Sequence, residues 1–118
     1  MSDFKTSKIM EKNSYFLLPN KHRRFEKIPY SEIVYLEGNI NYTLIHLQSG
    51  RVKISPRTLL FHINNSLNES FIRIHRAFCV NKEHIANYDE KVNANILFLK
   101  TGIQLAVSRR KRHALLVE

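Results

Sequence analysis

The chain of 118 residues has few of the residues that many functional sites require. Cys79 is its only cysteine, which excludes an intramolecular disulfide and a four-thiolate zinc site. Three glycines leave little material for a glycine-rich phosphate loop, and no apolar run is long enough to cross a bilayer. The N-terminal residues 1–12 are polar and do not lead into an apolar signal sequence. We therefore expect a cytoplasmic protein that does not bind a membrane.

Catalytic and metal-binding patterns are also missing from the sequence. There is no Walker loop, no nucleophile elbow and no zinc-protease motif, and the carboxylates are scattered, with only Asp89 and Glu90 adjacent. We expect neither an enzyme nor a cofactor, and no small-molecule substrate. The residues that come closest to a metal-ligand set are His46, His75, Cys79 and His84. Their spacing fits no zinc finger, so we expect packed histidines, a buried cysteine and no metal.

The chain has a large excess of positive charge, and this excess lies near its two ends. It has 19 Lys and Arg against 10 Asp and Glu, a formal net charge of +9. Residues 29–99 are nearly neutral, whereas basic clusters occur at Lys21–Arg24 and at Arg109–Arg112. This distribution is typical of a protein that binds a polyanion, although a basic run is also found on a solvated face.

Short runs of β-branched and aromatic residues predict a mainly β domain. Hydrophobic residues make up 43% of the chain, which is enough for a globular core. The expected strands are residues 33–36, 42–47, 52–54, 71–75, 78–80, 85–88, 96–100 and 104–107. Three glycines separate apolar segments and are expected at the tips of hairpins, namely Gly38, Gly50 and Gly102.

One segment follows a helical period instead. Leu59, Leu60, Ile63 and Leu67 recur at helical spacing, and Ser55-Pro56 before them suits a cap followed by proline in the first turn. We expect a helix of about three turns that covers one open end of the sheet. The basic C-terminal segment, residues 110–117, is compatible with one more helical turn.

Several blocks together resemble the LytTR DNA-binding domain. They are Ser31–Glu37 (SEIVYLE), Asn41-Tyr42, Phe71–Asn81 (FIRIHRAFCVN), Ile85 and Val107–Arg110 (VSRR). The resemblance runs from about Tyr15 to Val117, and we assign residues 14–118 to this domain and residues 1–13 to a polar N-terminal extension. Too few residues precede the domain for the receiver domain of a response regulator, so we expect a LytTR domain without one.

The resemblance implies a fold and a function. The fold is an elongated sandwich of short antiparallel sheets with one small α-helix. The function is that of a bacterial transcription regulator that inserts loops into successive major grooves of double-stranded DNA, commonly at direct repeats, which a homodimer could occupy. Carried over by position, Asn41, Arg76 and Arg109 contact DNA, and the neighbouring Arg110 contacts phosphate.

Each of these positions also has a structural interpretation. For Asn41 this interpretation is that it completes the turn after Gly38. For Arg76 it is an ion pair with a carboxylate such as Glu37. His75, Tyr42 and Asn81 are expected to support the fold. Two other functions stay open for the whole chain: a module that binds and modulates a full-length regulator, and a basic RNA-binding module.

Overall fold

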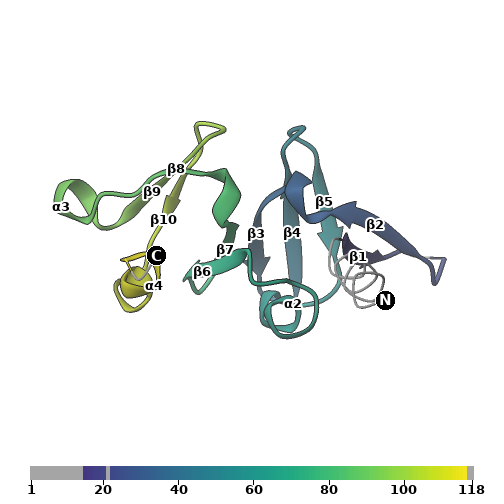
Figure 1. Ribbon diagram of the computed structural model, residues 1–118. Helices are drawn as coiled ribbons and strands as arrows, with labels where there is room; N and C mark the ends of the chain where they lie inside the picture. The colour runs from purple at the N-terminus through teal and green to yellow at the C-terminus, as the bar shows by residue number, and fades with distance from the viewer. Residues whose placement is uncertain (1–14, 21, 117–118) are drawn as a thin grey trace, which may run out of the picture.

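The computed structural model describes residues 15–20 and 22–116 (Figure 1). The expected N-terminal extension, residues 1–13, lies outside the described residues. Ten strands in the described part form three antiparallel sheets, which confirms the mainly β fold. The first sheet pairs β1 (Tyr15–Pro19) with β2 (Phe25–Pro29). No helix in these residues has the length and apolar character needed to span a bilayer.

A five-stranded sheet forms the centre of the molecule. Its order is β5 (Val52–Ser55), β4 (Tyr42–Leu47), β3 (Ile33–Asn39), β7 (Phe78–Asn81) and β6 (Phe71–His75). The third sheet has the order β10 (Gln104–Ala106), β9 (Ile96–Leu99) and β8 (Ile85–Asn87). In Figure 1 this third sheet lies on the left and the β1–β2 hairpin on the right of the central sheet.

Short helices connect or flank these strands. The α-helices are α2 (Leu59–Asn65), α3 (Glu90–Asn93) and α4 (Arg112–Leu116). Three 3-10 turns are η1 (Tyr30–Glu32), η2 (Lys82–His84) and η3 (Arg109–Lys111). The basic C-terminal segment is therefore helical as far as Leu116, and α3 was not foreseen from the sequence.

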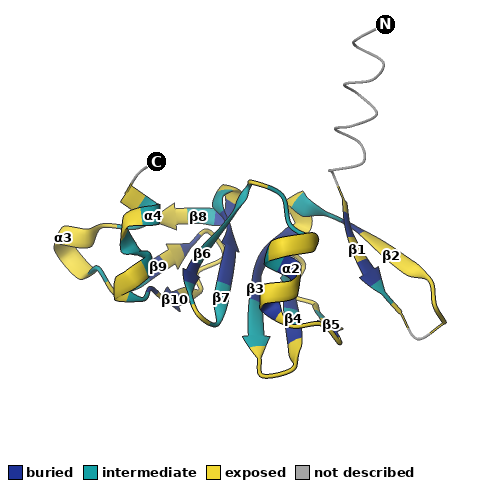
Figure 2. Ribbon diagram, turned by 90° about the horizontal axis from the view of Figure 1, so that it is seen from below, coloured by how far each residue is buried: buried dark blue, intermediate teal, exposed yellow. Residues whose placement is uncertain are grey.

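Two hydrophobic cores lie on either side of the central sheet, since the paired residues Leu36 and Cys79 belong to one core and the adjacent pair Tyr35 and Val80 to the other. Figure 2 shows the buried residues of these strands in dark blue. The first core contains Phe16, Leu18, Ile28, Ile33, Leu36, Ile45, Leu59 and Cys79. The second core contains Val34, Tyr35, Ile74, Val80, Leu97, Leu99, Leu105 and Val107. Because β3, β6 and β7 contribute to these cores, the turns at their ends are fixed to a rigid support.

Helix α2 differs from the sequence prediction at its start and in its length. Thr58 is the cap, since its Oγ1 accepts a hydrogen bond from the Phe61 N–H at 3.1 Å. Ser55 ends β5 instead, where its hydroxyl lies 2.7 Å from Nε2 of the buried His62. The other ring nitrogen of His62 bonds the Ser66 hydroxyl at 2.8 Å. The helix has seven residues, about two turns, so the expected third turn is wrong.

Gly38 is also not where the sequence placed it. Gly50 and Gly102 adopt a φ of 93° in turns, as expected, but Gly38 lies within β3 and pairs with Thr43. A Cβ at Gly38 would lie 3.0 Å from Cβ of Leu59, a tight contact, so the close approach of α2 favours glycine there. The hairpin tip is at Ile40 and Asn41, and Ile40 takes the positive φ, 54°.

Candidate nucleic-acid interface

The antiparallel register brings several turns to one end of the central sheet. Gly38 near the end of β3 donates its N–H to the Ala77 carbonyl at 2.8 Å, so the β3–β4 turn (40–41) and the β6–β7 turn (76–77) are neighbours. Figure 2 shows both turns at the lower edge of the molecule. Thr43 pairs with Ser55, which places the segment after β5 (56–58) at the same end. We call these segments, together with residues 108–111, the arginine end.

The β6–β7 turn presents Arg76 and is braced by two residues of β6. Arg73 donates from Nη2 to the Arg76 carbonyl at 2.8 Å and from Nε to the His75 carbonyl at 3.4 Å. Nδ1 of His75 accepts the Ala77 N–H at 3.0 Å. The backbone of the turn is thus held from within, and the exposed Arg76 side chain is directed by a fixed support. His75 is a supporting residue, as expected, and Arg73 is a support that the sequence did not reveal.

The β3–β4 turn presents Asn41. The side-chain amide of Asn39 donates to the Tyr42 hydroxyl at 2.8 Å and closes the base of the turn. Asn41 and Ile40 are both exposed at its tip. Asn41 therefore occupies a turn, which is its structural interpretation, and it also faces solvent at the arginine end.

Arg109 lies near the same end, beside the edge strand β6. The Ser108 N–H donates to the Ile74 carbonyl at 2.8 Å, and this bond holds the start of η3 against β6. Arg76 is two residues from Ile74 and Arg109 is one residue from Ser108. The lengths of these segments and of the hydrogen bond together limit the distance between the Cα atoms of Arg76 and Arg109 to about 18 Å. Arg110 follows in η3 and is exposed. The structure thus brings Arg76, Arg109 and Arg110 into one neighbourhood.

Arg57 is a fifth polar side chain at this end, and sequence reasoning missed it. It lies between β5 and α2, and its carbonyl accepts a hydrogen bond from the Thr43 hydroxyl at 2.8 Å. Its guanidinium lies 4.8 Å from the centroid of the Phe61 ring, a cation–π contact that leaves the side chain exposed. An Arg that directly follows Pro56 at the end of a predicted strand was the available signal.

The charges of the two sheet ends differ. The four segments of the arginine end contain five cations and no carboxylate: Arg57, Arg76, Arg109, Arg110 and Lys111. The opposite end, formed by residues 30–32, 48–51, 68–70 and 82–84, contains three glutamates and two cations. The arginine end is therefore a local site of positive potential on the sheet.

The arginines of this end are not neutralised. In residues 15–20 and 22–116, Glu37 forms a hydrogen bond with His46 at 3.0 Å and Glu26 forms an ion pair with Lys53 at 3.2 Å, and neither carboxylate contacts an arginine of this end. The alternative in which Arg76 pairs with Glu37 is therefore wrong, because Glu37 is held by His46, whose ring stacks on Tyr35 at 4.1 Å. Free guanidinium groups can bind phosphate or the edge of guanine with two hydrogen bonds.

The residues of the candidate metal set have other roles. His46 bonds Glu37, His75 accepts from Ala77, and His84 donates from Nε2 to the Ser31 carbonyl at 2.8 Å. Cys79 is buried, and desolvation raises the pKa of its thiol to about 12. In the part of the chain that the structure describes, no three His, Cys, Asp or Glu side chains form a possible metal site.

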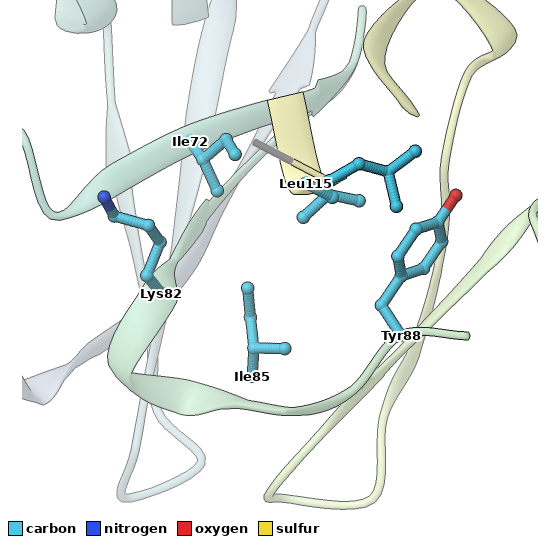
Figure 3. A pocket seen from close by; sticks show the side chains of 6 residues that line it. Ile72, Lys82, Ile85, Tyr88 and Leu115 are labelled. Atoms are coloured by element: carbon cyan, nitrogen blue, oxygen red, sulfur yellow. The ribbon is translucent and has the colours of Figure 1, made fainter. Parts of the chain in front are cut away.

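A cavity of about 280 Å³ lies away from the arginine end (Figure 3). Most of its lining is apolar: Ile72, Lys82, Ile85, Tyr88, Leu115 and Leu116. The second basic cluster does not belong to the arginine end, since Arg23 and Arg24 lie in the β1–β2 turn, on the right in Figure 1. Its Lys21 lies outside the described residues.

Comparison with known proteins identifies the family. The sequence profile of the LytTR DNA-binding domain matches residues 23–117, most of the chain. The chain belongs to the LytTR DNA-binding domain family. A solved structure from Bacillus cereus, the LytTR DNA-binding domain of a protein described as a methyl-accepting/DNA response regulator, has the same fold. The two share 23% sequence identity over 86% of this chain and 93% of that one, with a TM-score of 0.69. A search of curated proteins found no match.

Membership in the LytTR family confirms the resemblance that the sequence blocks suggested. It places the chain among DNA-binding domains of transcription regulators, of the kind found in two-component response regulators. The LytTR blocks that carry Asn41, Arg76 and Arg109 are the segments that meet at the arginine end.

Proposed function

We propose that this LytTR domain binds double-stranded DNA in a sequence-specific manner, as a cytoplasmic transcription regulator, through its arginine end. The observation that carries the proposal is the placement of Arg76 and Arg109, from segments 33 residues apart in the sequence, within about 18 Å on an end whose four segments contain no carboxylate. This separation is about half of one turn of B-DNA, so both side chains can reach the same duplex.

The side chains of the arginine end divide into two roles. Asn41, Arg76 and Arg109 contact base edges in the major groove, because they project from turns that the sheet holds in place. Arg110, Arg57 and Lys111 contact phosphates and supply affinity that depends on salt. A repeated motif in the bound DNA would mean that two copies of the chain bind side by side, either separately or as a homodimer.

Selection of duplexes from a random library, followed by mobility shifts on the enriched sequence, tests the proposal. Arg76→Ala and Arg109→Ala are expected to weaken binding by about 1–3 kcal/mol each and to relax preference at one base position. Arg51→Ala is the matched control, since Arg51 is exposed in the β4–β5 turn at the opposite end and its loss changes the net charge equally. This control should bind the selected duplex nearly as tightly as the parent.

Three results would overturn the proposal. The first is a library from which no sequence is enriched. The second is equal weakening by Arg51→Ala and Arg76→Ala, which would mean that total charge alone governs binding. The third is stronger binding to single-stranded RNA than to any duplex at matched salt, which would favour an RNA-binding module.

A further inference from the structure

The tip of the β3–β4 turn carries an apolar side chain that the fold does not use. Ile40 is 88% exposed, more than any other large hydrophobic residue in the described part of the chain. It belongs to neither hydrophobic core. Single exposed apolar residues are common on protein surfaces, so exposure alone does not distinguish Ile40.

The backbone at Ile40 makes this residue choice unusual. Its φ is 54°, a left-handed conformation that glycine and asparagine tolerate and that a β-branched residue rarely adopts. Asparagine occupies the positions on both sides, so the turn already contains the residue type that suits this geometry. A strained residue that contributes no packing is a candidate for a functional role.

The position of Ile40 indicates what that role is. The Gly38–Ala77 hydrogen bond and the short chain segments on either side of it limit the distance between the Cα atoms of Ile40 and Arg76 to about 18 Å. Ile40 therefore projects from the same end as the side chains proposed to contact bases, with Asn39 and Asn41 beside it. Bases present mainly polar atoms in the major groove, and the exception is the C5-methyl group of thymine.

We propose that Ile40 packs against the methyl group of a thymine in the major groove and determines specificity at that base pair. This inference rests on the proposed DNA-binding function and adds an apolar contact to it. The thymine lies within about one helical turn of the base that Arg76 contacts, because the two residues are so close. Removal of the Ile40 side chain costs the fold no core contact, so the effect should be confined to binding.

Replacement of thymine by deoxyuridine isolates the methyl group. In the duplex enriched by the parent protein, each thymine is replaced in turn by deoxyuridine, which removes one methyl group and keeps the base pair. At one thymine, or two adjacent ones, affinity should fall about fourfold, the effect expected for one buried methyl group. Replacement at the other thymines should leave affinity unchanged.

A double-mutant cycle then links that methyl group to Ile40. Ile40→Asn keeps a residue that tolerates the left-handed backbone, and this variant should bind the thymine and deoxyuridine duplexes equally. Ile40→Val retains branched methyl groups and should keep most of the preference for thymine. Val92→Asn is the matched control, since Val92 is 82% exposed on α3, and it should preserve the full difference between the two duplexes.

The outcomes separate this inference from the function on which it rests. If the parent enriches a duplex and requires Arg76, but no deoxyuridine replacement lowers its affinity, the thymine contact is refuted and DNA binding stands. The contact is also refuted if Ile40→Asn weakens binding while keeping the parent's preference for thymine, as a wedge between bases would. If no duplex is enriched, or Arg76→Ala binds as the parent does, both proposals fail.

Discussion

Substitution of Arg73 by lysine tests whether the β6–β7 turn is positioned from within the protein. The Arg73 guanidinium spans two carbonyl oxygens, at 2.8 Å on Arg76 and 3.4 Å on His75. Lysine keeps the positive charge but has one ammonium group, which does not reproduce the planar fork of arginine. The substitution should therefore loosen the turn that carries Arg76 without changing the net charge of the domain.

The size of the effect follows from the geometry. A hydrogen bond from a charged donor contributes about 1.5–3 kcal/mol in general, and a partly exposed one lies at or below the lower end of that range. The longer bond to His75 adds little. We expect Arg73→Lys to lower the free energy of unfolding by about 1 kcal/mol. If the same free energy, about 1 kcal/mol, must be spent to order the turn when DNA binds, affinity for the selected duplex falls about fivefold.

Urea denaturation measures the first effect, and fluorescence anisotropy with a labelled duplex over a salt series measures the second. The salt slope should stay at the parent value, because Arg73 contacts carbonyl groups and not a phosphate. A comparison with Arg73→Ala completes the test. If Arg73→Ala reduces the slope by about 0.9, the loss of one phosphate contact, then Arg73 binds DNA directly and the positioning role is refuted.

Three further predictions concern the fold. Gly38→Ala should destabilise the domain by about 1–3 kcal/mol in urea denaturation, because the new Cβ would lie 3.0 Å from Leu59, and an unchanged midpoint would contradict this close approach. His62 has a pKa lowered to about 4 by burial and, to a lesser extent, by Arg57, so between pH 6.5 and about 4 the unfolded chain binds a proton that the folded chain does not. The free energy of unfolding should therefore fall by about 3 kcal/mol as the pH falls through this window, and it should fall less in His62→Gln. If denaturation at several pH values gives the same pH dependence for the parent and for His62→Gln, His62 is not the cause. Cys79, with a pKa raised to about 12, should resist alkylation by iodoacetamide at about pH 8 in the folded state and react on denaturation, whereas rapid labelling of the folded protein would contradict its burial.

Much of the central sheet could be predicted from the sequence because its strands alternate between a core and a more exposed side. The β1–β2 hairpin was missed because its strands lack this alternation in the sequence. In β1 the outward residues Tyr15 and Leu17 are apolar, so no alternation is visible, and in β2 only Ile28 is buried. A hairpin whose outward side chains are also apolar carries a weak alternation pattern, even though Phe16, Leu18 and Ile28 are buried in the first core.

Long-range contacts explain the remaining errors. Gly38 resembles a turn residue in the sequence, and the reason for glycine there is Leu59, which lies 21 positions later. Ser55 resembles a helix cap, but its hydroxyl is engaged by His62 and the Arg57 N–H. These partners are brought together by the tertiary fold, so local sequence patterns do not reveal them.

The candidate site shows the same limit. Asn41, Arg76, Arg109 and Arg110 were found through their family blocks and through the change from apolar to polar residues at strand ends. Arg73 was missed because it alternates within a strand like any outward residue, and its role depends on the turn folding back over its guanidinium. Arg57 was missed because it lies alone between two predicted elements.

The central claim, that the arginine end faces the duplex, is tested most directly by nuclear magnetic resonance of the labelled domain during titration with the selected DNA. The account predicts that backbone amide signals of residues 40–41, 57, 76 and 109–110 shift most. Signals of the opposite end, residues 48–51 and 82–84, should stay near their free positions. Large shifts at the opposite end with little change at Arg76 and Arg109 would contradict the account.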